Sequence, residues 1–506
     1  MNRAIVRLFG VMILLFTILV VWTSRSTIFD ATALQNNPLN KLSTYASWKV
    51  KRGRLIADNG QTLAKSVPET GGVWSRTYPF GSLFAQTVGF SDQQQGEAVG
   101  MEDYFSPQLS GPKSSLEKVF GSFNGGTQQG DDVYSTLDPK AQALARTLLD
   151  TPGACGHDVT PCTGSVVAIV PQTGAVKVMY SNPTYNDNDP AKYSNGDYSD
   201  CAPNPFDNGC LVNLAVAGRF PPGSTFKIVT TTAALNTGKY TPTSTIVGNS
   251  PLEVSGAPLE NDGNQSWGAI SLTTALTNSV NTVYAQVGQN LGAKVMQEYM
   301  ERFGFYSIPP LQYPAGEMSP SGELVPKHGT YQPLLPTHPC TSPAYCVDVG
   351  RMSIGQDKLG VTPLQMAMVV STVADDGKLM EPRLATKVVN PDGQVVQTYP
   401  PTEYDQVMKP SVAKELQVMM KDVVEEGTGQ AADLEGFPIA GKTGTASTGH
   451  TEDGQPLDDA WFIGFPIQDP KIAVAVMLEN IPEGYGGTYA APIAAKLIKT
   501  LLSENQ

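Results

Sequence analysis

Residues 221–227 read Pro-Pro-Gly-Ser-Thr-Phe-Lys and open a predicted helix that ends near Gly238. Ser224 and Lys227 are three residues apart, so on a helix they share one face and the lysine amine can lie over the serine hydroxyl. Gly223 lets the backbone approach a ligand closely. The helix is apolar on most faces, which predicts that it is buried. At its positively polarised N-terminus, negative charge developing on the serine oxygen is favoured.

Two later motifs strengthen this interpretation, because Ser-x-x-Lys alone is a weak signal. Further matches to it begin at three other serines: Ser110, Ser115 and Ser411. The first later motif is Ser279-Val280-Asn281, for which an ordinary helix turn is the alternative. The second is Lys-Thr-Gly-Thr at 442–445, and Lys-Thr-Gly occurs nowhere else in the chain.

The N-terminus carries an apolar segment. From Leu8 to Trp22 the chain is free of charge, and with the residues just before it the run reaches about the length that a bilayer needs. Arg3 and Arg7 precede it, which predicts a cytoplasmic N-terminus and an extracytoplasmic remainder. A cleaved signal peptide is the alternative, but the nearest small-x-small site, at 31–33, lies well past the apolar run.

Strand patterns flank a helical middle. Asn59-Gly60 between apolar residues predicts one hairpin, and residues 164–170 and 175–180 predict another. Strands over 437–447, 460–465 and 472–478, the last of them central, precede a helix over 490–502. This arrangement predicts an α+β fold, with a mostly antiparallel sheet flanked by helices.

Three local expectations concern the middle of the chain. Ser279 and Asn281 are expected in a turn between two helices. Thr362 and Pro363 are expected as the N-cap and first residue of another helix. Residues 306–349 are rich in proline and are expected to form a loop.

Composition narrows the class of protein. The net charge of −13 argues against nucleic acid as a partner. Only four histidines are present, without a metal-binding pattern, so no metal and no cofactor are expected. The six cysteines form three pairs that are close in sequence, which favours disulfides in an exported chain, with six free thiols as the alternative. The pairs are Cys155/Cys162, Cys201/Cys210 and Cys340/Cys346.

The three motifs, in this order, resemble those of the penicillin-recognising serine acyltransferases. With the N-terminal anchor and the segment after it, the chain resembles class B penicillin-binding proteins over nearly its whole length. Matching motifs in the first third are Arg52-Gly53, Tyr78-Pro79, Gly100-Met101-Glu102 and Thr136-Leu137-Asp138. Those in the remainder are Asn213-Leu214-Ala215, Ser353-Ile354-Gly355-Gln356, Thr362-Pro363-Leu364-Gln365 and Asp459-Ala460-Trp461-Phe462.

The resemblance implies an architecture in three parts. Residues 1–27 are expected to form the cytoplasmic tip and membrane anchor, and residues 28–155 an elongated β-rich pedestal of the dimerisation type. Residues 156–506 are expected to form the transpeptidase domain, which includes an all-helical subdomain. A glycosyltransferase site around Glu102 is rejected, since the spacing of its neighbours does not fit.

The expected chemistry begins with Ser224 as nucleophile and Lys227 as its base. A free lysine has a pKa of about 10.4, and lowering it by ~3 units requires about 4 kcal/mol of preference for the neutral form. Burial and the nearby Lys442 cation both act in that direction. Ser279 is expected to relay the proton to the leaving amine. Asn281 is expected to hold the substrate amide and orient the lysine.

Residues 442–445 are expected to bind the substrate. Lys442 contributes positive charge near its carboxylate, and Thr443 and Thr445 offer hydroxyls to the same group. Gly444 allows an extended peptide to lie against the strand edge. The resemblance further implies that the backbone N–H groups of Ser224 and Thr445 form an oxyanion hole.

The resemblance implies a D,D-transpeptidase that crosslinks peptidoglycan stem peptides outside the membrane, releases D-Ala and is acylated by β-lactams. A membrane glycosyltransferase of the RodA/FtsW kind is the expected partner. Two enzymatic alternatives and one non-enzymatic alternative remain: hydrolysis of β-lactams, which needs a deacylating base; sensing of β-lactams; and a scaffold for the glycosyltransferase. Candidate bases for hydrolysis are three glutamates: Glu301, Glu317 and Glu323.

Overall fold

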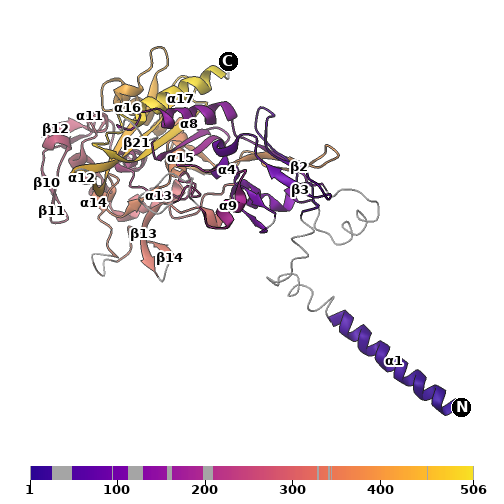
Figure 1. Ribbon diagram of the computed structural model, residues 1–506. Helices are drawn as coiled ribbons and strands as arrows, with labels where there is room; N and C mark the ends of the chain where they lie inside the picture. The colour runs from indigo at the N-terminus through magenta and orange to yellow at the C-terminus, as the bar shows by residue number, and fades with distance from the viewer. Residues whose placement is uncertain are drawn as a thin grey trace.

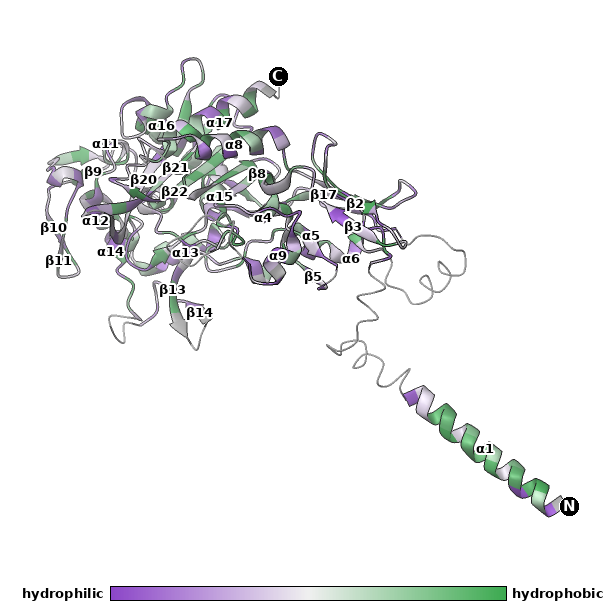
Figure 2. Ribbon diagram, viewed as in Figure 1, coloured by the Kyte–Doolittle hydropathy of each residue, from purple (hydrophilic) through white to green (hydrophobic). Residues whose placement is uncertain are grey.

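The N-terminal helix is the part of the molecule suited to a membrane. The structure is a computed structural model (Figure 1), and α1 (Asn2–Ser24) is apolar along its length (Figure 2). Its 23 residues span about 35 Å, enough for a bilayer core of about 30 Å. None of its apolar window is buried, so α1 is a candidate membrane span, as predicted. The residues that the structure describes are 2–25, 48–93, 95–111, 129–156, 162–197, 209–327, 330–339, 342, 345–452 and 454–504.

An antiparallel five-stranded sheet, here called the catalytic sheet, forms the centre of the C-terminal part. In spatial order its strands are β20 (Ile439–Glu452), β21 (Gln455–Pro466), β22 (Ala473–Pro482), β7 (Gly164–Val170) and β8 (Ala175–Asn182). The apolar strand β22 is central and β7–β8 is a hairpin, as predicted. The β20–β21 hairpin is longer than predicted, because the polar residues between the expected strands pair with one another beyond the sheet.

Helices cover both faces of the catalytic sheet (Figure 1). On one face lie α17 (Ala490–Glu504) and α8 (Pro139–Asp150), which also contact each other. On the other lies α15 (Pro363–Ala374), every residue of which is buried. The hydroxyl of Thr362 accepts from the backbone N–H of Gln365 (3.1 Å), so the predicted N-cap is confirmed.

A helical subdomain packs beside β20 and α15. Its helices are α10 (Lys227–Asn236), α11 (Leu272–Thr277), α12 (Asn281–Leu291), α13 (Ala293–Arg302) and α16 (Pro410–Glu425). The chain turns between α11 and α12 where the sequence predicts it. Small two-stranded pairs at its edge are β9 (Thr245–Val247) with β12 (Ala269–Ser271), and β10 (Leu252–Val254) with β11 (Ala257–Leu259).

A mixed six-stranded sheet, here called the pedestal sheet, lies toward the N-terminal side. In spatial order it comprises β18 (Val395–Thr398), β17 (Ala385–Val389), β6 (Asp132–Ser135), β1 (Leu55–Ile56), β2 (Thr62–Pro68) and β3 (Trp74–Thr77). The predicted turn at Asn59-Gly60 joins β1 to β2. Strands β17 and β18 come from far along the chain, so the pedestal sheet is not built from consecutive residues.

A buried ion-pair cluster holds the pedestal together. Glu102, on α5 (Gly100–Tyr104), is fully buried and contacts Arg52 at 2.8 Å and Arg76 at 2.6 Å. Burial raises the pKa of Glu102, but the two arginines outweigh it and hold that pKa below its usual value. The carboxylate is therefore a structural anion, sealed from any substrate.

Residues 306–349 differ from their prediction as a loop. They contain β13 (Gly322–Lys327), which pairs with β14 (Thr330–Pro333) and, at its start, with β15 (Leu359–Gly360). Pro326 lies within the β13–β14 ladder. Proline is rare inside strands, so its presence suggested a loop, but it is tolerated where a strand lies at a sheet edge.

A Gly/Ser/Gln-rich loop that the sequence suggests over 110–130 falls mostly outside the described residues. Of the loop suggested over 181–210 by its Asn, Asp and Pro content, residues 198–208 lie outside them, and the described part contains the short helix α9 (Pro190–Ser194).

One predicted disulfide is present, between Cys155 and Cys162. Cys210 and Cys346 are also disulfide-bonded. The pairings predicted for them involve Cys201 and Cys340, which lie outside the described residues.

Short elements complete the described structure. The helices are α4 (Ala85–Val88), α6 (Ser106–Leu109), α9 (Pro190–Ser194) and α14 (Val349–Met352). The strands are β4 (Ser91–Asp92), β5 (Glu97–Ala98), β16 (Lys378–Met380) and β19 (Glu403–Gln406).

Candidate active site

Ser224 lies on a short 3-10 turn, η3 (Gly223–Phe226), and α10 begins only at Lys227. The predicted helix is thus present, but its first turn is tighter than an α-helix. Gly223 enters this turn with φ +51°, a left-handed conformation that favours glycine.

Three contacts fix the serine turn against the rest of the fold. The N–H of Gly223 donates to the carbonyl of Gly355 (3.1 Å), and the indole N–H of Trp461 donates to the carbonyl of Pro221 (3.0 Å). A Cβ on Gly223 would lie only 2.5 Å from the carbonyl oxygen of Thr445. The turn therefore sits directly against β20, with no room for a side chain between them.

Lys227 is completely buried, and its amine is held by the turn between α11 and α12. Nζ lies 2.7 Å from the carbonyl oxygen of Ser279, 3.1 Å from its Oγ and 2.7 Å from Oδ1 of Asn281. In the described structure the Lys227 amine makes no hydrogen bond to the Ser224 hydroxyl, although the sequence predicted that the two would lie together. A neutral amine has two N–H groups that donate and one lone pair that accepts, so it can donate to only two of these three oxygens. In the third hydrogen bond the amine must instead be the acceptor. Only the Ser279 hydroxyl can donate in return.

Burial lowers the pKa of Lys227 well below its usual value, and the charge of Lys442 lowers it further. Burial alone lowers the pKa of Lys442 to about 7. Neither amine has a carboxylate partner in the part of the chain that the structure describes. The predicted burial of Lys227, close to the charge of Lys442, is confirmed.

The segment carrying Ser279 is held in an uncommon backbone conformation. Ser279 has φ +56°, and the N–H of Val280 donates to the carbonyl of Ala275 (2.9 Å) to close the turn. The amide Nδ2 of Asn281 donates to the carbonyl of Glu260 (3.0 Å), which leaves Oδ1 to accept from Lys227. The turn thus aims a hydroxyl and an amide at the buried amine.

Strand β20 supplies the opposite wall from the edge of the catalytic sheet. The Lys442 amine donates to the carbonyl of Thr443 (3.1 Å), and the Thr443 hydroxyl pairs with that of Thr428 (2.6 Å). A Cβ on Gly444 would lie 2.7 Å from the carbonyl oxygen of Pro222. The missing side chain of Gly444 therefore makes room for the serine turn, a packing reason that the sequence did not indicate.

These elements enclose a cavity of about 910 Å³. Five predicted residues line it: Ser224, Ser279, Asn281, Thr443 and Thr445. Lys227 and Lys442 are buried behind its wall. The candidate nucleophile, the candidate proton relay and the edge of β20 therefore meet at one cavity. Among the described residues, no three His, Cys, Asp or Glu side chains lie close enough together to hold a metal ion.

Comparison with known proteins places this geometry in a family. Residues 164–499 match the penicillin binding protein transpeptidase domain, and residues 52–133 match the penicillin binding protein A dimerisation domain. The chain belongs to the penicillin-binding protein transpeptidase family.

Similar penicillin-binding proteins have been named and solved. The peptidoglycan D,D-transpeptidase PbpA of Mycolicibacterium smegmatis is 32% identical, over all of both chains. Penicillin-binding protein A from M. tuberculosis, solved as a ceftriaxone acyl-enzyme complex, has a TM-score of 0.77 and 29% identity, covering 90% of this chain and 99% of that one. Its penicillin G acyl-enzyme complex has a TM-score of 0.74 and 30% identity, covering 89% and 99%.

This penicillin-binding protein also has site residues that sequence reasoning missed. Four further residues line the cavity: Glu260 and Asp262 from one segment, Tyr485 from a second loop, and Asp458 from β21. The charge of Asp262 raises the pKa of Tyr485. No local sequence pattern identifies these residues, because only the fold brings them together. The one signal in the sequence is the glycine pair that follows Tyr485, which is typical of a loop that approaches a ligand.

Proposed function

We propose that this protein is a peptidoglycan D,D-transpeptidase that works through an acyl-serine on Ser224. The observation that carries the proposal is the shared cavity, where Ser224, the Ser279–Asn281 turn and the edge of β20 meet next to two buried lysines. The family membership and the acyl-enzyme complexes of its relatives support the same chemistry.

In the first half-reaction, Oγ of Ser224 attacks the carbonyl between the two terminal D-alanines of a stem peptide. Neutral Lys227 takes the proton from that oxygen. When the C–N bond breaks, a proton returns through the Ser279 hydroxyl to the leaving amine of D-Ala. In the second half-reaction an acceptor amine attacks the acyl carbon, gives up a proton along the same path, and the Ser224 hydroxyl is restored.

Backbone and side-chain donors stabilise the oxygen that becomes negative. We assign the oxyanion hole to the N–H groups of Ser224 and Thr445, supported by the close approach of η3 to β20. Losing one such donor typically costs about 3–4 kcal/mol of transition-state stabilisation. Asn281, oriented by its hydrogen bond to Glu260, holds the substrate amide and positions the lysine.

The substrate carboxylate binds along β20. The Lys442 ammonium attracts it, and the hydroxyls of Thr443 and Thr445 donate hydrogen bonds to it. Gly444 contributes backbone only, so an extended peptide can add to the free edge of β20. β-Lactams, which mimic this peptide, acylate the same serine.

The predicted division of the chain becomes part of the proposal. Residues 1–27 anchor the protein with its N-terminus in the cytoplasm and its catalytic domain outside. Residues 28–155 supply the first strands of the pedestal, and residues 156–506 form the transpeptidase domain and add β17 and β18 to the pedestal sheet. Through anchor and pedestal the protein works beside a membrane glycosyltransferase of the RodA/FtsW kind. The orientation follows from Arg3 and Arg7 at the start of α1.

Hydrolysis of β-lactams is the alternative chemistry, and geometry weighs against it. The three glutamates considered as deacylating bases are absent from the described lining of the cavity. Glu323 is buried against the Tyr306 hydroxyl, and Glu317 accepts from the N–H of Gly100.

Mass spectrometry of the penicillin adduct tests the proposal. Purified protein incubated with penicillin G should gain the mass of one intact drug molecule, on the peptide that contains Ser224, and keep it for hours. Ser224→Ala should gain nothing, with Ser411→Ala, from an accidental Ser-x-x-Lys match, as the matched control. Rapid loss of the adduct would reject the transpeptidase in favour of a hydrolase. Crosslinking of stem peptides by the Ser224→Ala protein would overturn the assignment of the nucleophile.

A further inference from the structure

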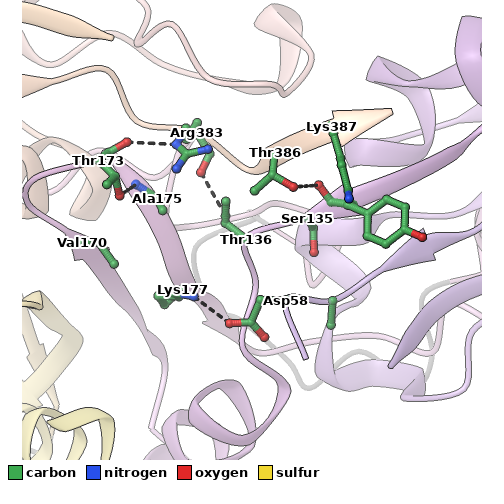
Figure 3. A pocket seen from close by; sticks show the side chains of 12 residues that line it. Asp58, Ser135, Thr136, Val170, Thr173, Ala175, Lys177, Arg383, Thr386 and Lys387 are labelled. Carbon is green, nitrogen blue, oxygen red and sulfur yellow. Dashed lines mark hydrogen bonds and ion pairs between the residues drawn. The ribbon is translucent and has the colours of Figure 1, made fainter. Parts of the chain in front are cut away.

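A second cavity lies where the pedestal sheet meets the catalytic sheet (Figure 3). Its volume is about 450 Å³. One side is formed by β6, β17 and the end of β1, and the other by the β7–β8 hairpin. This joint cavity is separate from the catalytic one and shares no lining residue with it.

The joint cavity is positively charged in a chain whose net charge is −13. Its lining contains three cations, Lys177, Arg383 and Lys387, against one carboxylate, Asp58. Lys177 is paired with Asp58 at 2.7 Å. Lys387 extends over the ring of Tyr134, with Nζ 4.7 Å from the ring centre, and has no carboxylate partner in the described structure.

Arg383 is held rigidly but keeps a free donor. Its Nε donates to the carbonyl of Thr173 and its Nη1 to the carbonyl of Tyr399, both at 2.9 Å. Within the described chain, Nη2 has no hydrogen-bond partner, and no carboxylate neutralises the guanidinium. A cation already fixed by two carbonyls loses little conformational freedom when it binds an anion.

A neighbouring hollow of about 550 Å³ also contains Asp58 and Lys177, and it adds Asp138, Lys140 and Lys471. Lys471 is paired with Asp469 at 2.7 Å, so only the cations of the joint cavity count toward ligand binding. The Asp138 carboxylate already caps α8, where its Oδ1 accepts from two backbone N–H groups.

We propose that the joint cavity binds a phosphate group carried on a small organic ligand. The two excess positive charges balance a phosphate dianion, and a guanidinium N–H with two ammonium groups provides the donors that phosphate prefers. A volume of about 450 Å³ exceeds what a phosphate alone fills and lies within the usual range for small-molecule sites. Such a ligand contacts Lys387 on the pedestal sheet and Lys177 on the catalytic sheet, and so ties the two sheets together.

Calorimetric titration of the detergent-solubilised full chain tests this site, with inorganic phosphate and glycerol 3-phosphate as probes. Lys387→Gln should weaken binding by about tenfold or more, and Lys387→Arg, which keeps the charge, should retain it. Asp58→Asn should strengthen binding, because it removes the competing carboxylate. The matched control is Lys65→Gln, since Lys65 is exposed on β2 of the same pedestal sheet and should leave binding unchanged.

The proposal fails if neither phosphate compound binds the wild-type chain, or if Lys387→Gln and Lys65→Gln bind alike. It also fails if malonate, a dicarboxylate, binds as tightly as the phosphates. Acylation by penicillin G, measured on every variant, should stay at the wild-type rate. The acylation rate tests the proposed catalytic function, and the phosphate titration tests the joint cavity. The two proposals can therefore fail separately, because phosphate binding does not depend on catalysis.

Discussion

Two clusters of buried charged side chains, one in the pedestal and one behind the catalytic cavity, are stabilised in opposite ways. In the pedestal, Glu102 is fully buried between Arg52 and Arg76, within 3 Å of each. Behind the catalytic cavity, Lys227 and Lys442 are just as deeply buried, yet neither meets a carboxylate among the described residues.

The difference separates a structural charge from a chemical one. Glu102 recovers its cost of desolvation from two partners, stays ionised and fixes its neighbours. An unpartnered buried lysine cannot recover that cost and shifts its pKa instead, which makes it a base or a titrating cation near neutral pH. Removing the Glu102 carboxylate should therefore lower the stability of the fold, and removing the Lys227 amine should lower the activity.

The largest expected effect is that of Lys227→Met on activity. Without its base, Ser224 should be acylated by penicillin about 10³-fold more slowly, measured with a fluorescent penicillin by stopped flow. The free energy of unfolding should stay within about 1 kcal/mol of wild type, because the methionine avoids the cost of neutralising a buried lysine, and this gain offsets the hydrogen bonds that the Ser279 and Asn281 oxygens lose. A variant that lost stability and activity together would erase the contrast between the two clusters.

Glu102→Gln should produce the reverse pattern. It leaves two buried arginines without an anion and should lower the free energy of unfolding by about 3–5 kcal/mol, measured by urea denaturation. The folded variant should still be acylated at the wild-type rate. Its control is Arg54→Gln, which breaks the partly exposed pair with Asp132 and should cost less than about 1 kcal/mol.

The stability of Glu102→Gln should also depend on pH differently from that of the wild type. Because the pKa of Glu102 is lower in the folded chain than its usual value, the carboxylate stabilises the fold above the unfolded pKa. This contribution is lost as the pH falls through the folded pKa. The stability of Glu102→Gln should therefore decline less on acidification than that of wild type, and equal declines would argue against a structural anion.

A smaller effect is expected from Gly444→Ala. The new Cβ would approach the carbonyl oxygen of Pro222 and the Thr225 methyl within about 3 Å, so the serine turn must shift. Overpacking of this kind costs about 1–3 kcal/mol, which predicts acylation about 10- to 100-fold slower. Gly316→Ala, at a glycine without a left-handed φ and with no atom within 4 Å of its Cβ position, is the control for a glycine substitution outside the site. Wild-type kinetics in Gly444→Ala would contradict the packing reason given for this glycine.

The smallest expected effect is a few-fold change with pH. Lys442 has a pKa of about 7, so it is charged below this pH and loses its attraction for the ligand carboxylate as the pH rises past it. Acylation by penicillin should therefore show a falling limb centred near pH 7. In Lys442→Arg, which stays charged, this limb should disappear, whatever the absolute rate. A limb unchanged in Lys442→Arg would assign it to another group.

The sequence predicted what local patterns encode. The three motifs identified Ser224, Lys227, the Ser279–Asn281 turn and the strand at 442–445, and the structure brings them to one cavity. Asp262 and Tyr485 could not be predicted, since their loops meet only in the folded chain. The β13–β14 pairing was missed because proline is also a loop signal. The contacts of the Lys227 amine differ from expectation because its partners, Ser279 and Asn281, reach it only through the fold.

Strand β6 lies between β1, which precedes it, and β17, which follows it by some 250 residues. During synthesis, the first strands of this sheet emerge long before the strand that closes their open edge. An unpaired edge is a template for association with other chains. The early segment must therefore be kept from aggregating until about three quarters of the polypeptide has been made, so a part of the molecule that appears early in synthesis is completed late in folding.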